Sequence, residues 1–170
     1  LKESQLIFLQ SQINPHFLYN TLNAGAQLAM MEGAEKTTLF IENLADFFRY
    51  SVKRTGQVSS LADEISQVET YLHIINVRFS DEIQYIKRLE GSVERYTLPG
   101  VILQPIVENA INHGLRDVKW EKKIDLLARE EEERILVTIT DNGKGMTQEE
   151  IEAVLVGQPI EIEMDGQPHR

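Results

Sequence analysis

A histidine beside a proline, His16, is the first candidate for chemistry in this sequence. Pro15 precedes it, and Asn20 follows four residues later, which places the side chains of His16 and Asn20 on the same side of a helix. A proline within a helix costs about 3 kcal/mol, because it removes a backbone hydrogen bond and clashes with the preceding turn. A neutral imidazole is a nucleophile near pH 7. The alternative is that His16 is an ordinary exposed or structural residue of a helix.

The second candidate is the segment 104–114, which predicts a helix with one apolar side and one polar edge. The polar edge carries Glu108, Asn109, Asn112 and His113. An amide oxygen such as that of Asn109 is a suitable ligand for Mg²⁺, which completes its octahedron with waters and phosphate oxygens. Glu108 is a second candidate ligand. The alternative is a solvated helix face with a histidine near its C-terminus, where the helix dipole favours a cation.

The third candidate is the segment Asp-Asn-Gly-Lys-Gly at residues 141–145, between a predicted strand and a predicted helix. Gly143 and Gly145 permit a tight turn and a close approach of the backbone to a ligand. Asp141, at the end of the strand, can accept a hydrogen bond from an exocyclic amine such as that of adenine. The alternative is an ordinary Asp-Asn-Gly turn.

Helices are predicted to carry His16. Residues 1–31 predict one helix that ends at Gly33, and residues 36–53 predict a second. At about 100° per residue, the first helix has an apolar stripe made of Leu6, Leu9, Ile13, Phe17, Ala24, Leu28 and Met31. Two antiparallel helices cannot bury such faces alone, so we expect hairpins from two chains to form a four-helix bundle. A third helix is predicted from a capping box at Ser60 and Asp63 to about residue 79.

The chain changes character after residue 80, which divides it into predicted domains at 1–80 and 81–170. The second half predicts a strand at 83–89, a helix at 100–113, strands at 123–130 and 134–140, a helix from Thr147 to about 156, and a mobile loop at 157–170. The predicted fold class is therefore α+β, with a helical hairpin followed by a two-layer α/β sandwich.

Composition excludes several classes of function. The chain has 170 residues, a formal net charge of −10 and no cysteine. The negative charge argues against direct binding of nucleic acid through a basic surface, and the lack of cysteine excludes disulfides and thiolate chemistry. No apolar run approaches the length of a membrane span. The chain opens at Leu1 in a helical pattern, so we expect a fragment with a further region upstream.

Taken together, these segments resemble the LytS-type sensor histidine kinases of bacterial two-component systems. Residues 14–23 resemble their phosphoacceptor box, residues 103–114 their N box, residues 141–145 their first G box, and residues 61–79 their linking helix. The resemblance covers nearly the whole chain. The histidine box is specific to this family, whereas the two nucleotide boxes are shared with gyrase-type and Hsp90-type ATPases.

The resemblance implies a mechanism. ATP would bind the sandwich as its Mg²⁺ complex, with Asp141 reading the adenine amino group and Asn109 holding the metal. The residues that would contact ATP are Asn109, Asn112, His113, Asp141, Gly143, Gly145 and Met146. A ring nitrogen of His16 would accept the phosphoryl group and pass it to an aspartate of a response regulator. Asn20 would orient the water that removes the phosphoryl group.

The resemblance also implies a homodimer, a response regulator with a DNA-binding output domain, and a place on the cytoplasmic side of the bacterial membrane, reached through an upstream region. Asn112 stands where the family often has lysine, which would pair with phosphate. Phe17 follows the histidine where many other histidine kinases carry an acid, so the general base is unassigned. No second glycine box of the Gly-x-Gly-Leu-x-Asn kind follows Met146. We therefore expect an ATP-binding domain that is incomplete at its C-terminal end and binds nucleotide weakly or not at all.

Two alternatives stand beside this interpretation. The first is an inactive dimerisation and signalling module, which Asn112 and the missing glycine box favour. The second is a gyrase-like ATPase without a histidine acceptor, against which the hairpin with Pro15 and His16 argues. The stimulus, the regulator and the choice between transfer within one subunit and transfer between subunits do not follow from the sequence.

Overall fold

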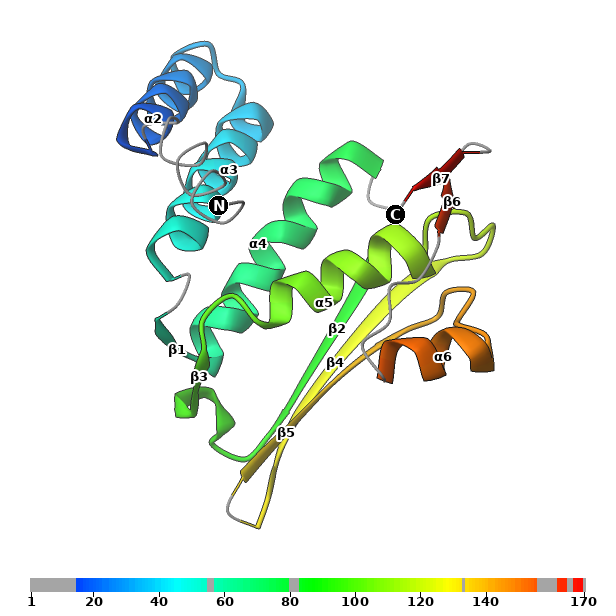
Figure 1. The fold of residues 1–170 in the computed structure, drawn as a ribbon. Coiled ribbons are helices and arrows are strands. Elements are labelled where there is room, and N and C mark those ends of the chain that lie inside the picture. The colour runs from blue at the N-terminus through cyan, green and yellow to red at the C-terminus, as the bar shows by residue number, and fades with distance from the viewer. Residues whose placement is uncertain are drawn as a thin grey trace, which may run out of the picture.

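The computed structural model describes residues 15–54, 57–79, 83–132, 134–155, 162–164 and 167–169. Its first two helices, α2 (Pro15–Met31) and α3 (Glu35–Arg54), form a hairpin (Figure 1). Gly33 lies between them with φ of 72°. The N–H of Ala34 donates to the carbonyl of Ala29 at 2.8 Å, and the N–H of Gly33 donates to that of Met30 at 3.0 Å. This is the Schellman arrangement, which confirms that Gly33 ends the first helix. The prediction that Pro15 interrupts a longer helix involves residues before 15, which lie outside the described ranges.

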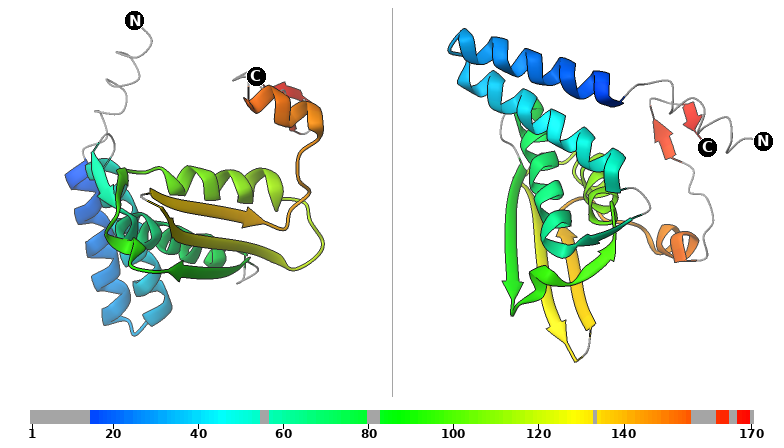
Figure 2. Two further views of the ribbon diagram at one scale, coloured as in Figure 1. Left: turned by 90° about the horizontal axis from the view of Figure 1, so that it is seen from below. Right: turned by 90° about the vertical axis from the view of Figure 1, so that its left-hand side faces the viewer.

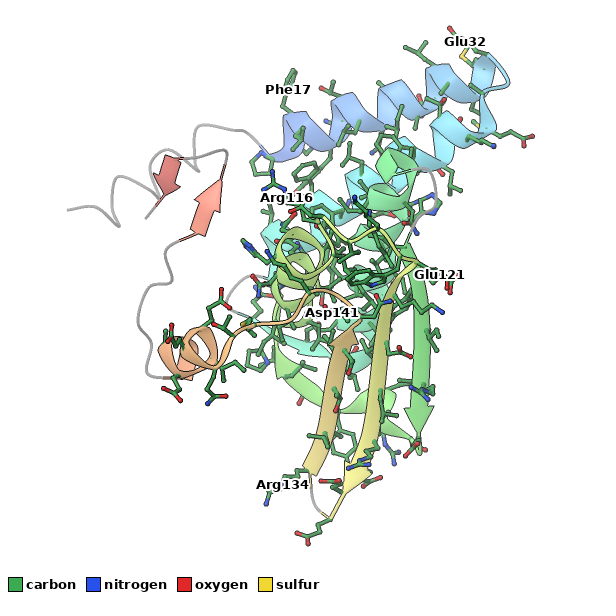
Figure 3. The ribbon with its side chains drawn as sticks, turned by 90° about the vertical axis from the view of Figure 1, so that its right-hand side faces the viewer. Phe17, Glu32, Arg116, Glu121, Arg134 and Asp141 are labelled. Atoms are coloured by element: carbon green, nitrogen blue, oxygen red, sulfur yellow. The ribbon has the colours of Figure 1, made fainter. Side chains whose placement is uncertain are left out.

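The apolar stripe predicted for the first helix is uncovered in the single chain. Phe17 is 70% exposed, Leu28 61% and Met31 82%, and Phe17 projects away from the rest of the chain (Figure 3). Helix α2 instead buries Ala26 and Ala29. The other stripe residues, Leu6, Leu9 and Ile13, lie outside the described part of the chain. The exposure of these three residues agrees with the expectation that one hairpin cannot bury the stripe alone; the four-helix bundle of two chains stays a prediction.

Helix α4 (Leu61–Phe79) begins at the predicted cap, because the N–H of Asp63 donates to the Ser60 hydroxyl at 3.1 Å. Strand β1 (Val58–Ser60) leads into it and pairs antiparallel with β3 (Thr97–Pro99). A single turn, η1 (Val93–Arg95), precedes β3. Sequence patterns did not predict the β1–β3 pair.

A three-stranded sheet has the order β2 (Ile83–Glu90), β4 (Lys122–Glu131) and β5 (Arg134–Asp141). Strands β2 and β4 are parallel, whereas β4 and β5 form an antiparallel hairpin in which Glu131 lies opposite Arg134. All three predicted strands are confirmed, each to within one residue at either end.

Helices α4 and α5 (Leu103–Asn109) cover one face of this sheet (Figures 1 and 2). The core between the two layers is made of aliphatic side chains from both helices and from the strands, namely Leu61, Ile65, Val68, Leu72, Ile83, Leu103, Val107, Ile111, Ile124, Leu126 and Ala128. The predicted class, a helical part followed by a mixed helix and sheet part, is confirmed. Because α4 shares this core with the sheet, the two parts are packed together; the division into 1–80 and 81–170 stays a prediction.

The helix predicted over residues 100–113 is shorter and less regular than expected. Helix α5 begins at Leu103, and at Ala110 it widens into a π-helical turn, η2 (Ala110–Gly114). The N–H of Leu115 donates to the carbonyl of Ala110, five residues back, at 2.9 Å. Turns of this kind are frequent at functional sites.

The C-terminal part holds one confirmed and one wrong prediction. Helix α6 (Gln148–Leu155) follows Thr147, whose hydroxyl accepts from the N–H of Glu150 at 3.2 Å. The predicted loop at 157–170 is wrong in part, because β6 (Ile162–Met164) and β7 (Gln167–His169) form an antiparallel pair. Over the described residues, no helix combines the length and the apolar character needed to cross a membrane.

Candidate functional site

His16 and Asn20 lie on consecutive turns of α2, and both are exposed. The Asn20 amide Nδ2 is 3.2 Å from His16 Nδ1. An amide N–H only donates, so the ring nitrogen that receives it carries a lone pair. The predicted neighbourhood of the two side chains is confirmed, whereas their roles in chemistry stay predictions.

The polar edge of α5 and η2 is open to solvent. Asn109, Asn112 and His113 are exposed. Glu108 is half-buried and accepts a hydrogen bond from the Gln104 amide at 2.7 Å. The structure therefore leaves the three outer side chains available to a ligand and ties Glu108 to its own helix.

Close contacts among four residues hold the end of η2 against the end of β5 and the turn that follows it. The N–H of Gly143 donates to Asp141 Oδ1 at 2.9 Å, and the N–H of Lys144 donates to the carbonyl of Gly114 at 3.0 Å. A Cβ added to Gly143 would lie 2.3 Å from the Gly114 carbonyl oxygen, and one added to Gly114 would lie 2.6 Å from Asp141 Oδ1. A side chain at Gly143 would overlap backbone, and one at Gly114 would overlap the Asp141 carboxylate, so the predicted second and third candidate segments lie in direct contact.

Asn142 fastens this turn to the loop before β4, and its role was missed in the sequence. Its Oδ1 accepts from the N–H of Lys123 at 2.8 Å, and its Nδ2 donates to the carbonyl of Glu121 at 2.7 Å. The indole N–H of Trp120 donates to the Asn142 carbonyl at 2.8 Å. The Asp-Asn-Gly pattern indicated a turn, but no signal in the sequence indicated which loop the turn would bind.

The exposed groups around this junction suit a nucleotide. Asp141 is partly exposed, so its carboxylate can accept from a base amine. Gly145 has φ of 69° with open space where a Cβ would stand, and Met146 is 57% exposed. Within the described residues, no group of three or more His, Cys, Asp or Glu side chains forms a metal cage. A single amide oxygen with phosphate and water ligands suits Mg²⁺, which seldom uses an all-protein cage.

Comparison with known proteins identifies the family. The family model for histidine kinases (His_kinase) matches residues 4–83. The sensor histidine kinase BtsS of Escherichia coli is 35% identical over 142 residues, which are 84% of this chain and 25% of BtsS. The sensor protein LytS of Staphylococcus haemolyticus is 31% identical over 159 residues, which are 93% of this chain and 27% of LytS. The chain belongs to the LytS-type sensor histidine kinases.

The chain thus spans about a quarter of the length of these two relatives. A solved histidine kinase domain, from the blue-light activated histidine kinase of Erythrobacter litoralis, aligns with 79% of this chain and 75% of its own at 17% identity and a TM-score of 0.40. That likeness is too distant to bear on function.

In this LytS-type chain, His16 and the nucleotide boxes lie apart. Helix α2 and the connection from β5 to α6 stand on opposite sides of α4 and α5 in two views (Figures 1 and 2). The phosphoryl transfer to His16 that the sequence predicts would therefore require a movement of the hairpin, or nucleotide boxes supplied by a partner subunit.

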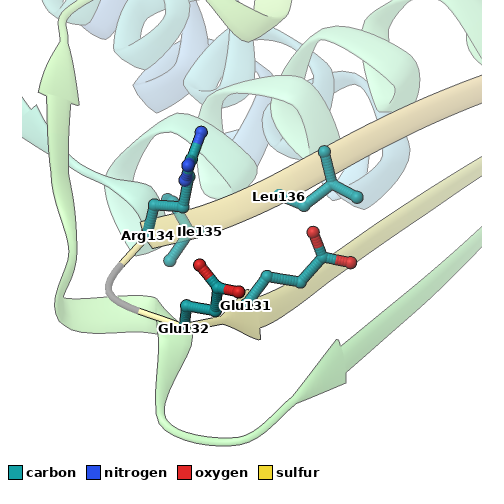
Figure 4. Close-up of a pocket in the computed structure, with 5 residues that line it drawn as sticks. All are labelled: Glu131, Glu132, Arg134, Ile135 and Leu136. Carbon is teal, nitrogen blue, oxygen red and sulfur yellow. The ribbon is translucent and has the colours of Figure 1, made fainter.

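Two surface hollows differ in their relation to the site. One is lined by Glu131, Glu132, Arg134, Ile135 and Leu136 at the tip of the β4–β5 hairpin (Figure 4). The strand register puts this tip at the far end from Asp141, which pairs with Ile124. The other is lined by residues 118–122, next to Asn142. Only the second hollow adjoins the candidate site.

Proposed function

We propose that this chain is the catalytic core of a sensor histidine kinase that phosphorylates His16 from ATP. The observation that carries the proposal is the interlocking of Gly114 and Gly143 around Asp141. It unites the two predicted nucleotide segments in a chain that also carries the phosphoacceptor sequence 14–23.

The residues have separate tasks in this proposal. Asp141 accepts a hydrogen bond from the adenine amino group, while Gly143, Gly145 and Met146 line the approach of the nucleotide. Asn109 is the protein ligand for Mg²⁺, with Glu108 as a second candidate, and the metal neutralises phosphate charge. Phosphoryl transfer depends mainly on positioning and on charge stabilisation. Asn112 and His113, on the same exposed edge, contact the phosphates.

The acceptor is a ring nitrogen of His16. Its lone pair attacks the γ-phosphorus, the bond between phosphorus and the bridging β–γ oxygen breaks, and ADP leaves. The phosphoryl group then passes to an aspartate of a response regulator, which we expect to carry a DNA-binding output domain. The working unit is a homodimer formed through the hairpins, on the cytoplasmic side of the membrane.

Radiolabelled ATP tests the proposal. In the intact protein, with a complete ATP-binding domain, we expect acid-labile, alkali-stable label on the wild type and none on His16→Ala. His73→Ala is the matched control, because His73 is an exposed histidine on helix α4, and it should retain the label. Label that survives in His16→Ala would refute His16 as the acceptor. An intact wild-type protein that binds no nucleotide and takes no label would instead support the inactive module, which the neutral side chain of Asn112 favours.

A further inference from the structure

A buried carboxylate on α4 has no task in the proposed reaction. Glu64 lies in the first turn of α4 and is 1% exposed, the one charged side chain within the buried core of the described residues. A buried charge is costly unless hydrogen bonds compensate it. The hydrogen-bond donors that compensate the charge of Glu64 therefore show which elements this side chain connects.

Glu64 uses both oxygens, each with two donors. Its Oε1 accepts from the Tyr50 hydroxyl at 2.6 Å and from the N–H of Val101 at 2.7 Å. Its Oε2 accepts from the N–H groups of Ile102 at 2.8 Å and Leu103 at 3.2 Å. Tyr50 belongs to α3, whereas Leu103 opens α5. One side chain thus joins the hairpin that carries His16 to the helix that carries Asn109.

The backbone that Glu64 holds is strained. Val101 has φ of 61°, a region that β-branched residues avoid. Such conformations persist where the surrounding structure imposes them, and they gather at switching and functional sites. Because the N–H of Val101 donates to Glu64, the carboxylate fixes this segment directly. The start of α5 is therefore held in place by α3 and α4 together.

The hairpin rests on α4 through directional contacts. The Tyr50 hydroxyl lies 2.5 Å from the Ser59 hydroxyl, and the buried amide of Gln67 donates to the carbonyl of Phe47 at 3.2 Å. The ring of Phe47 stacks on Tyr71 with centroids 5.8 Å apart. Burial and the hydrogen bond to Glu64 raise the pKa of Tyr50 to about 12, so the hydroxyl stays a donor at neutral pH. Sliding or rotation of α3 would break these contacts.

We propose that Tyr50 and Glu64 are positioning residues that couple the placement of hairpin helix α3 to the backbone at Val101–Leu103, and thereby set helix α5 for phosphoryl transfer. The inference rests on the proposed function. Neither side chain touches the reacting atoms; both act through α5. A hairpin movement that withdraws Tyr50 removes one hydrogen-bond donor from Glu64 and loosens the strained backbone at Val101. In the other direction, a shift of α5 moves Glu64 and therefore displaces Tyr50.

Tyr50→Phe tests this coupling, and Tyr96→Phe is its matched control. The Tyr96 hydroxyl also donates to a glutamate, Glu130 Oε1 at 2.5 Å, but this contact lies at the sheet and does not involve the hairpin. In nucleotide-free protein, hydrogen exchange is measured by NMR at the amides of residues 101–103. We expect Tyr50→Phe to speed their exchange by about tenfold, and Tyr96→Phe to leave it within about twofold of the wild type. Equal exchange in Tyr50→Phe and wild type would overturn the coupling.

Kinetic measurements distinguish a positioning role of Tyr50 from a role in the stability of the fold alone. We expect Tyr50→Phe to lower kcat for His16 phosphorylation about tenfold with a smaller change in KM for ATP, because helix α5 is misplaced whereas the adenine contact of Asp141 is retained. Lower thermal stability with unchanged kcat per folded molecule would overturn the proposal. Glu64→Gln should lower kcat further, since its NH₂ group must face two of the four donors. A wild-type chain that never labels His16 refutes the proposed function alone, because the exchange experiment needs no ATP.

Discussion

Gly143 and Gly145 lie in the same turn with one residue between them, yet the two positions exclude side chains for different reasons. A side chain at Gly143 would overlap the carbonyl of Gly114, whereas Gly145 needs only its positive φ. We expect Gly143→Ala to abolish nucleotide binding and to destabilise the chain by about 2 kcal/mol or more, as overpacking does. Calorimetry with ATP and Mg²⁺, together with chemical denaturation, measures both effects.

Gly145→Ala is the control for this prediction. It imposes the left-handed conformation on an alanine in open space, at a cost of about 1 kcal/mol. Nucleotide affinity should stay closer to that of the wild type than in Gly143→Ala. If both variants bound ATP equally, the contact between Gly114 and Gly143 would not be what shapes the site.

Asn20 gives a second prediction for a single residue. Its amide lies 3.2 Å from His16 Nδ1, close enough to orient a water at a phosphorylated ring. We expect Asn20→Ala to accept label from ATP and to lose it about tenfold more slowly, since an oriented water is a better nucleophile. The half-life of the isolated phosphoprotein measures this, and a half-life equal to that of the wild type would remove Asn20 from the reaction.

Among the elements, the N-terminus of α6 is closed by a reciprocal cap. Thr147 accepts from the N–H of Glu150, and the Glu150 carboxylate accepts from the N–H of Thr147 at 2.6 Å. These hydrogen bonds hold the pKa of Glu150 below its usual value, and the bond from the Thr147 backbone N–H has the largest effect. The contribution of the cap is therefore present above a pH of about 4.3, the ordinary glutamate value, and is lost as the pH falls through the lowered pKa.

We expect the amides of α6 to exchange faster as the pH falls through this window, after correction for intrinsic rates. Thr147→Ala should show faster exchange at every pH, because the cap is gone. Glu150→Gln should remove the pH dependence. A pH dependence that persists in Glu150→Gln would assign it to another group.

The sequence predicted elements whose signals are local. Gly33, Ser60 and Thr147 marked the helix ends that the structure confirms, and alternation of apolar residues predicted β2, β4 and β5. Strands β1 and β3 have three residues each, which is too short for any period to register. The last residue of η2, Gly114, lies against Asp141, which is far along the chain.

The candidate site was predictable to the same extent. Motif positions such as Asn109 and Asp141 could be named from the sequence, since each has a local pattern. The anchoring by Asn142 and the clamp by Glu64 could not, because their partners are backbone groups of loops that only the fold brings near.

At the scale of the whole molecule, the uncovered stripe on α2 predicts the oligomeric state. Leu28 and Met31 expose an apolar face along the hairpin, and burial of such a face by a second copy is favourable. We expect the wild type to be a dimer and Leu28→Glu to be a monomer by light scattering. Val77→Glu, which changes an apolar residue of α4 that is 52% exposed, should remain a dimer. A monomeric wild type at high concentration would contradict the bundle.

The contact between Trp120 and Asn142 has a practical consequence. The chain contains one tryptophan, and its indole N–H is bonded to the turn that follows Asp141. Its fluorescence spectrum therefore reports on the surroundings of this turn, without a dye or an engineered label. A ligand that shifts the turn should change the emission, so that the natural chain serves as its own optical titration sensor.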